Sequence, residues 1–136
     1  MSERTHDGRG RGPDPRRSLG TWAEGLCASE LERRGWRILD RNWRIRMGEL
    51  DIVALDGRAL VMVEVKSQRA GNRSGPVRPV LAVGRLKQRR LRMLAQAWLQ
   101  AGGRRARFET VRFDVVGITI DAAGAVARWQ HVENAF

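Results

Sequence analysis

The segment Gly48–Lys66, with the sequence GELDIVALDGRALVMVEVK, decides the fold of this chain. Two runs of strand-forming residues flank Asp56-Gly57, a dipeptide that is a strong short-range signal for a β-hairpin turn. The hairpin carries Asp51 on its first arm and Glu64 and Lys66 on its second, all in apolar surroundings. Burying an unpaired charge is costly, so these three side chains need a chemical explanation.

The register of the hairpin decides which of these side chains meet. A two-residue loop at Gly57-Arg58 would place Asp51 directly opposite Glu64, whereas a loop one residue earlier would place the two diagonally. Because strand side chains alternate with a period of two, both registers put Asp51, Glu64 and Lys66 on one face of the sheet. A three-residue loop would break this arrangement unless a bulge restored it.

Two carboxylates and an ammonium on one face indicate either a metal site with a lysine beside it or a salt-bridged cluster at a sheet edge. Mg²⁺ takes oxygen ligands and is often held by one or two carboxylates, waters and substrate phosphate oxygens. A bound metal can activate water and neutralise charge on a phosphate during displacement. Lys66 could orient that water or stabilise the charged transition state. For three charges in this pattern, we favour the metal site.

These motifs resemble the signature of the PD-(D/E)XK nuclease superfamily, with Asp51 followed by Glu64-Val65-Lys66. More closely, the chain resembles the YraN family of small bacterial proteins, which are similar to archaeal Holliday-junction resolvases. In that family a small hydroxyl residue and then Arg usually follow the lysine, whereas here Ser67 is followed by Gln68. The other matching segments are Gly20–Glu24, Gly35–Leu39, Asn42–Arg44, Gly48–Val53 and Arg112–Val116.

The resemblance implies an α/β fold of the restriction-endonuclease-like type, a mixed β-sheet flanked by helices, and metal-dependent phosphodiester hydrolysis. It implies that Asp51, Glu64 and Glu24 ligate Mg²⁺ (or Mn²⁺) and that they act with Lys66 as the catalytic set. Glu24 also has a second interpretation, because Thr21-x-x-Glu24 fits a helix capping box. The residues alone leave both interpretations of Glu24 open.

The charge of the chain indicates which kind of partner it binds. The chain has 26 Lys and Arg against 15 Asp and Glu, a net charge of +11, and residues 65–108 contain twelve basic residues and no acid. Such a segment beside an acidic site predicts a polyanionic partner, with DNA favoured over RNA. The alternative is a solvated surface in an arginine-rich protein. The candidate nucleic-acid contacts are Arg69, Arg73 and Arg78 in the loop after the hairpin and Lys87 on the next helix.

Two functions from different classes follow from these features. The first is an endonuclease-like protein that hydrolyses phosphodiester bonds in nucleic acid, with branched DNA as one substrate. The second is a non-catalytic nucleic-acid-binding protein that retains the nuclease fold. We favour the first, because carboxylates facing an anion would oppose binding unless a metal ion intervened.

Patterning along the chain predicts one domain. Residues 1–17 are rich in Gly, Pro and Arg without apolar periodicity, so we expect a disordered basic tail before a nuclease-like domain over residues 18–136. Lys87 falls within the apolar arc of the second predicted helix, from which it could reach the acidic site or a phosphate, or extend into solvent. The elements expected are helices over 19–34 and 80–101, a strand over 36–39 that can continue to 45, the hairpin over 48–66, and strands over 112–120 and 126–132.

The remaining reactive residues are interpreted as structural. Cys27 is expected to be a core thiol, His6 and His131 to be incidental, and Asp114 to be a structural partner of a basic residue rather than a metal ligand. No apolar run approaches the ~20 residues of a membrane helix, so no membrane partner is expected. The single cysteine and the lack of a signal-peptide pattern favour a cytoplasmic protein. A homodimer stays open, because no hydrophobic patch can be assigned to an interface.

Overall fold

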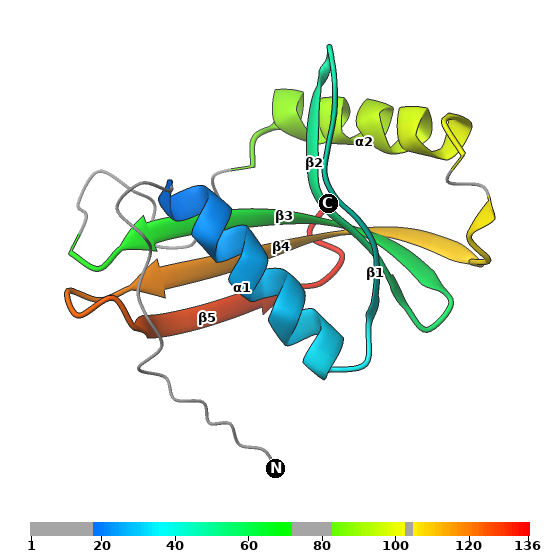
Figure 1. Ribbon diagram of the computed structural model, residues 1–136. Coiled ribbons are helices and arrows are strands. Elements are labelled where there is room, and N and C mark those ends of the chain that lie inside the picture. The colour runs from blue at the N-terminus through cyan, green and yellow to red at the C-terminus, as the bar shows by residue number, and fades with distance from the viewer. Residues whose placement is uncertain (1–17, 72–82, 103–104) are drawn as a thin grey trace.

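The computed structural model describes residues 18–71, 83–102 and 105–136, and in them the chain forms two helices and one five-stranded sheet (Figure 1). This arrangement confirms the predicted α/β class, a mixed sheet flanked by helices as in restriction-endonuclease-like folds. In chain order the elements are α1 (Leu19–Arg33), β1 (Arg37–Ile45), β2 (Gly48–Asp56), β3 (Ala59–Arg69), α2 (Arg85–Gln100), β4 (Thr110–Ile120) and β5 (Val126–Val132).

The sheet is mixed because one of its strand pairs is parallel. The strands lie side by side in sequence order, β1-β2-β3-β4-β5. β3 and β4 run parallel, and the other three neighbouring pairs are antiparallel. Parallel neighbours need a long crossover connection, and α2 lies within that crossover. This crossover lets β4 join the same sheet directly beside β3.

The β2–β3 hairpin has the first of the two predicted two-residue loops, the one at Gly57-Arg58. Asp56 pairs with Ala59, which leaves Gly57 and Arg58 as a two-residue turn. Gly57 has φ +60°, as the first central position of a type II′ hairpin turn requires. The recorded ladder ends at the pair of Ile52 with Val63, and one further step in the same register places Asp51 opposite Glu64.

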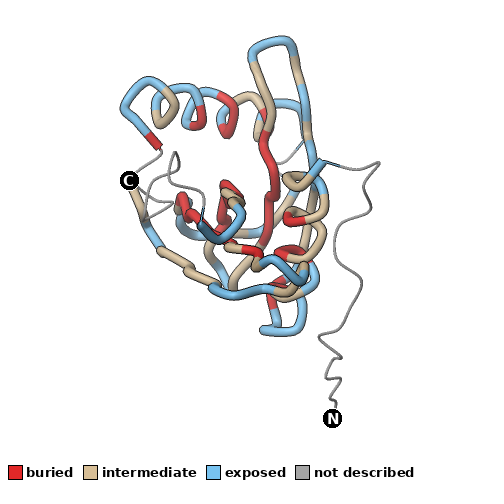
Figure 2. The backbone as a smooth tube through the Cα atoms, turned by 90° about the vertical axis from the view of Figure 1, so that its left-hand side faces the viewer, coloured by how far each residue is buried: buried red, intermediate tan, exposed pale blue. Residues whose placement is uncertain are grey.

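The two helices pack on opposite faces of the sheet, and β2 is buried between them (Figures 1 and 2). α1 contributes Ala23, Cys27 and Leu31 to one apolar cluster, and α2 contributes Leu91 and Leu94 to the other. Each fully buried aliphatic side chain of this size stabilises the fold by about 1.5–3 kcal/mol. The sheet residues of the α1 cluster are Ile52, Ala54, Val61, Val63, Val65, Val116, Ile118 and Ile120, and those of the α2 cluster include Leu50, Val53, Leu60, Met62, Phe113 and Val115.

Strand β2 changes its orientation near its beginning. Leu50 and Ile52 should share a face by simple alternation, yet Leu50 packs in the α2 cluster and Ile52 in the α1 cluster. Gly48 begins the strand with φ +153°, and a Cβ built there would lie 3.3 Å from Leu94 Cδ1 on α2. The strand therefore twists where it passes between the helices, and Asp51 lies at this twist.

The predicted ends of α1, α2 and β1 can be compared with those in the structure. α1 ends as predicted, because Gly35 adopts φ +94° directly after the last turn. α2 begins at Arg85 rather than near residue 80: Gly84 is its N-cap in an extended conformation (φ −76°, ψ 174°), and Val83 is not helical. β1 is one strand to Ile45, with a register shift between Ile38 and Asp40.

Some predictions fall outside the described residues. The tail over residues 1–17 and the loop positions Arg73 and Arg78 belong to this group. Arg69 is described, and it is exposed at the end of β3. In the described part of the chain, no helix combines the length and the apolarity that crossing a membrane requires.

Candidate active site

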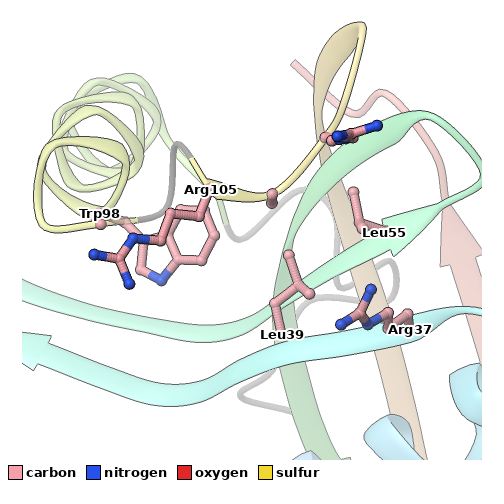
Figure 3. A pocket seen from close by; sticks show the side chains of 8 residues that line it. Arg37, Leu39, Leu55, Trp98 and Arg105 are labelled. Carbon is pink, nitrogen blue, oxygen red and sulfur yellow. The ribbon is translucent and has the colours of Figure 1, made fainter.

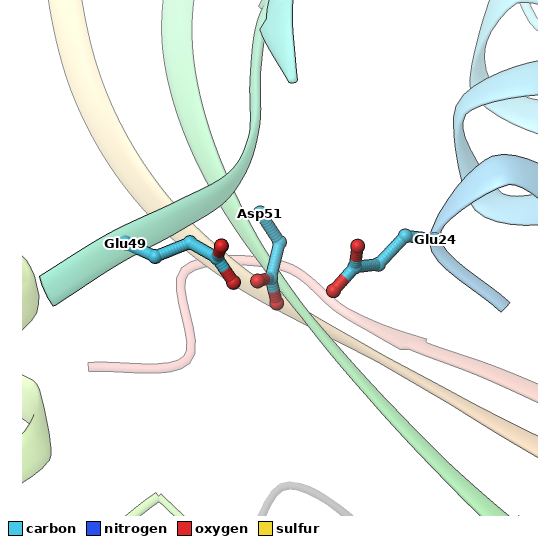
Figure 4. Close-up of side chains that lie close together, drawn as sticks. All are labelled: Glu24, Glu49 and Asp51. Atoms are coloured by element: carbon cyan, nitrogen blue, oxygen red, sulfur yellow. The ribbon is translucent and has the colours of Figure 1, made fainter. Parts of the chain in front are cut away.

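Three carboxylates from two elements meet beside the start of β2. Oxygen atoms of Glu24 on α1 and of Glu49 and Asp51 on β2 all lie within 4.8 Å of one another. Figure 4 shows the three side chains pointing toward a common region between the helix and the strand. Asp51 is only 9% exposed, so it lies at the buried centre of this group, which we call the acidic cluster.

Asp51 has little to compensate its charge. Its Oδ2 accepts one hydrogen bond, 2.9 Å from the backbone N–H of Val65. Burial, and after it the charge of Glu64, raises the pKa of Asp51 to about 8, against the opposing effect of that N–H donor. Burial and the charge of Glu49 likewise raise the pKa of Glu24. Carboxylates that repel one another in a buried place are stabilised by a bound cation, which supplies the missing charge.

Glu64 lies beside the acidic cluster but is paired with lysines. It is 6% exposed, and its Oε2 is 3.3 Å from the Nζ of Lys66 and 2.7 Å from the Nζ of Lys87. Burial would lower the pKa of Lys87, but its hydrogen bond to Glu64 and the charge of Glu64 raise it instead. The prediction that Lys87 reaches the acidic site is thus confirmed as a contact, while its role toward nucleic acid stays a prediction.

The capping interpretation of Glu24 is wrong. The N-cap of α1 is Ser18, whose side-chain oxygen accepts a 3.1 Å hydrogen bond from the N–H of Thr21. Glu24 therefore lies in the second turn, too far along the helix to act as the acid of a capping box. Its side chain is directed to β2 instead, as the resemblance implied.

Glu49 is a site residue that the sequence analysis did not assign. It lies two residues before Asp51 on the same strand, and this spacing alone could have indicated a shared face. Arg44, its partner across the β1–β2 ladder, binds it with Nη2 2.6 Å from Oε2. The side chain of Arg44 is 75% exposed, so water screens this pair.

The residues present fit a hard divalent cation. Among the described residues, the carboxylates of Glu24, Glu49 and Asp51 form the group that could hold it, and Glu64 lies next to this group without belonging to it. All of the donors are oxygens, which Mg²⁺ and Mn²⁺ prefer over softer ligands. The ligand set implied by the resemblance was Glu24, Asp51 and Glu64, so the structure adds Glu49 and leaves Glu64 to its lysines.

Comparison with known proteins identifies the family. A family model described as "Uncharacterised protein family UPF0102" matches residues 23–118. The chain belongs to the UPF0102 family, also called the YraN family. It is 46% identical over 127 residues to a UPF0102 protein of Geobacter sulfurreducens, covering 93% of this chain and 94% of the relative. A relative from Rhodococcus jostii is 45% identical (88% and 96% covered), and one from Anaeromyxobacter dehalogenans is 43% identical (95% and 91% covered).

The region that defines the UPF0102 family contains the whole candidate site. The matched residues 23–118 begin just before Glu24 and include the acidic cluster, Glu64 and both lysines. The resemblance inferred from the motifs is thereby confirmed at the level of the family. The names of these relatives state no activity, so the function is argued from the site.

A second buried charge in this UPF0102 protein has a different character. Asp114 on β4 is fully buried and binds Arg112 in two hydrogen bonds of 2.9 and 3.0 Å. It also lies 2.8 Å from His131 Nε2 and accepts a 3.0 Å hydrogen bond from the N–H of Asn134. Although burial acts to raise the pKa of Asp114, these partners lower it overall. The predicted structural role of Asp114 is confirmed.

His131 is not incidental, and that interpretation was wrong. Its side chain is 9% exposed, it contacts Asp114, and its ring lies 5.5 Å from the ring of Trp36. The sequence signal was limited to its place in the predicted strand over 126–132; in the structure it pairs with Val116, two residues from Asp114. Cys27, by contrast, is the core thiol that was expected, and burial raises its pKa to about 12, so it carries no nucleophilic thiolate at neutral pH.

A groove elsewhere on the molecule is separate from this chemistry. Its volume is about 520 Å³, and Arg37, Leu39, Leu55, Trp98 and Arg105 are among the residues that line it (Figure 3). None of the residues of the acidic cluster lines this groove. Its arginines add to the positive surface, while the candidate active site is the acidic cluster with Glu64 and its lysines.

Proposed function

We propose that this UPF0102 protein is a metal-dependent endonuclease-like enzyme that hydrolyses phosphodiester bonds in nucleic acid, with DNA, including branched DNA, as its substrate. The observation that carries the proposal is the buried, under-compensated acidic cluster directly beside Glu64 and Lys66. In a protein of net charge +11, carboxylates buried together serve no evident packing purpose. A cation that joins them to a phosphate accounts for both features.

Each side chain has a defined task in this proposal. Glu24, Glu49 and Asp51 would hold Mg²⁺ or Mn²⁺, with Glu64 as a further ligand once a lysine leaves it, and the metal would supply water activation and charge neutralisation at the phosphate. Lys66 lies beside Glu64 on β3, where its ammonium can orient the attacking water or donate to a phosphate oxygen. The Val65 N–H holds Asp51 in place, because the strand backbone that donates this hydrogen bond is part of the sheet.

The basic surface supplies the affinity for a polyanion. Arg69 is exposed at the end of β3, where its guanidinium can reach a phosphate of a bound nucleic acid. Arginine contacts of this kind bind phosphates without reading sequence, and they weaken steeply as salt rises. We therefore expect substrate choice by shape rather than by base sequence.

Cleavage of end-labelled four-way junction, flap and linear DNA tests the proposal. The purified full chain is assayed in Mg²⁺ and in Mn²⁺, with EDTA as the metal-free control. Asp51→Asn and Lys66→Met should each lower the cleavage rate by about 10² or more, since each removes a group that acts on the reacting phosphate. Glu32→Gln, on the exposed side of α1, is the matched control and should cleave like the wild type.

The same assay separates the proposal from the non-catalytic alternative. Salt-sensitive DNA binding without metal-dependent cutting would favour a nucleic-acid-binding protein that retains the nuclease fold. Cutting that persists at the wild-type rate in Asp51→Asn and Lys66→Met would indicate a contaminating nuclease. Thermal unfolding of every variant shows whether a lost activity reflects a lost fold.

A further inference from the structure

Lys66 and Lys87 bind the same oxygen of Glu64 from different parts of the fold. Lys66 lies two residues after Glu64 on β3, so the pleat of the strand keeps both side chains on one face. Lys87 lies in the first turn of α2, and it makes the shorter contact, 2.7 Å against 3.3 Å. The Lys87 side chain is 41% exposed and that of Glu64 is 7% exposed, so water reaches the lysine far more than the carboxylate.

Lys87 and a divalent cation would compete for Glu64. Oxygen ligands lie about 2.0–2.1 Å from Mg²⁺, so a cation on Glu64 Oε2 and an ammonium on the same atom would be within about 5 Å of each other. Two positive charges at that distance repel strongly where water is largely excluded. Lys87 can leave because water hydrates its half-exposed ammonium and because the arriving cation compensates the buried Glu64 carboxylate in its place.

The position of Lys87 would allow a phosphate to replace Glu64 as its partner. Its helix begins beside the site, and the first turn of a helix also presents backbone N–H groups that favour anions. Lys66, in contrast, is tied to Glu64 by its strand and is only 27% exposed. Of the two lysines, Lys87 is therefore the one that can exchange a carboxylate for a phosphate.

We propose that Lys87 is a displaceable counter-ion: it neutralises Glu64 in the metal-free protein, leaves when a divalent cation binds, and then takes a phosphate oxygen of the nucleic-acid strand. The inference rests on the proposed function, which supplies the metal, and it adds a coupling between the binding of the metal and the binding of the phosphate. Because binding linkage is reciprocal, metal and phosphate each bind more tightly when the other is present. Lys87 is a positioning residue for both.

Calorimetric titration of the full chain with Mg²⁺, without nucleic acid, tests the first half of this proposal. A pH of about 8.5 limits competition from protons at the carboxylates. Lys87→Met should bind Mg²⁺ about tenfold more tightly than the wild type, whereas Lys87→Arg, which restores the charge, should bind it like the wild type. Arg89→Met removes one charge from the same helix at an exposed position, and it should change the affinity by no more than about twofold.

A non-hydrolysable ligand tests the second half. The titration is repeated with a dinucleotide that carries a methylene-phosphonate linkage. This ligand should raise the Mg²⁺ affinity of the wild type by a factor about tenfold larger than it raises that of Lys87→Met, in which only the direct contact between metal and phosphate couples the two. An equal rise in both proteins would overturn the transfer of Lys87 to the phosphate.

The outcomes also separate this inference from the function on which it rests. Equal Mg²⁺ affinities for the wild type, Lys87→Met and Arg89→Met would overturn the role of Lys87 and leave the metal site intact. Weaker binding by Lys87→Met would overturn it as well, because Lys87 would then support the metal rather than oppose it. No Mg²⁺ binding by the wild type or by Lys87→Met would overturn both the metal site and this inference.

Discussion

Asp51 and Asp114 are two buried aspartates of one sheet, and their surroundings are opposite. Asp114 accepts hydrogen bonds from the Arg112 side chain and the Asn134 backbone and contacts His131, and its pKa is lowered. Asp51 has a single N–H donor and acidic neighbours, and its pKa is raised to about 8. Burial alone therefore does not mark a carboxylate as a functional candidate, whereas burial without compensation does.

The two aspartates also affect the stability of the fold in different ways. The partners of Asp114 are all supplied by the chain, so its charge is stabilised in every state of the site. Under the proposed function the partner of Asp51 is a cation, whose binding would relieve the repulsion among the buried carboxylates.

The largest expected effect is at Asp114. Asp114→Asn should lower the free energy of unfolding by about 3 kcal/mol, because it removes a fully buried carboxylate that accepts hydrogen bonds from Arg112 and Asn134. Urea denaturation measures the change, and Glu32→Gln on the exposed side of α1 is the control. A loss of unfolding free energy no larger than that of the control would show that Asp114 does not stabilise the fold.

The next effect is stabilisation by metal. Mg²⁺ at about 100 times its dissociation constant should add about 2.7 kcal/mol to the stability of the wild type and raise its melting temperature. Asp51→Asn should lose most of this gain, because it removes the buried carboxylate at the centre of the acidic cluster. A thermal shift that is the same in Asp51→Asn and the wild type would show that Mg²⁺ acts elsewhere. Asp114→Asn should retain the shift.

A smaller effect of opposite sign is expected at Asp51 without metal. Asp51→Asn should raise the free energy of unfolding by about 1–2 kcal/mol near pH 8 in EDTA, because it removes a repelled, desolvated charge. Thermal unfolding in EDTA measures the change, with Glu32→Gln as the reference. Destabilisation as large as that of Asp114→Asn would mean that Asp51 is a structural residue and that the contrast does not hold.

The two aspartates should also give opposite pH dependences. The folded-state pKa of Asp51 lies above its ordinary value of 3.8, so its contribution to stability is greatest below about pH 4 and is lost as the pH rises toward 8. Asp114 has a lowered pKa, so its contribution is present above its ordinary value and is lost as the pH falls. Unfolding measured from pH 4 to 8 in EDTA should show a smaller decline for Asp51→Asn than for the wild type. An unchanged slope would contradict the raised pKa of Asp51.

The smallest effect is expected at Arg44. Arg44→Met should raise the Mg²⁺ affinity by only about two- to threefold, since its pair with Glu49 is exposed and screened. The gain should vanish in high salt, which a calorimetric titration at two ionic strengths would show. A gain as large as that expected for Lys87→Met would mean that exposure does not distinguish these two cations.

Local sequence patterns predicted part of the candidate site and left part of it open. The turn signal and the period of a strand were enough to predict that Asp51, Glu64 and Lys66 share one face, because a hairpin joins neighbours in sequence. The structure then decided between the two registers, and its pairing of Asp56 with Ala59 places Asp51 opposite Glu64. Glu49 was within reach of the same argument and was missed. The interpretation of Glu24 could not be decided locally, because the competing N-cap, Ser18, begins the helix three residues before Thr21.

The sequence by itself determined the fold class, the hairpin, the basic charge and the family, since alternation, turn residues and motif spacing are properties of adjacent residues. Only the tertiary structure decided that Glu24 meets the twisted start of β2, that Lys87 reaches Glu64 and that His131 binds Asp114. These contacts join residues that are between 17 and 27 positions apart. Their geometry depends on how the helices pack on a twisted sheet, and no local periodicity specifies that packing.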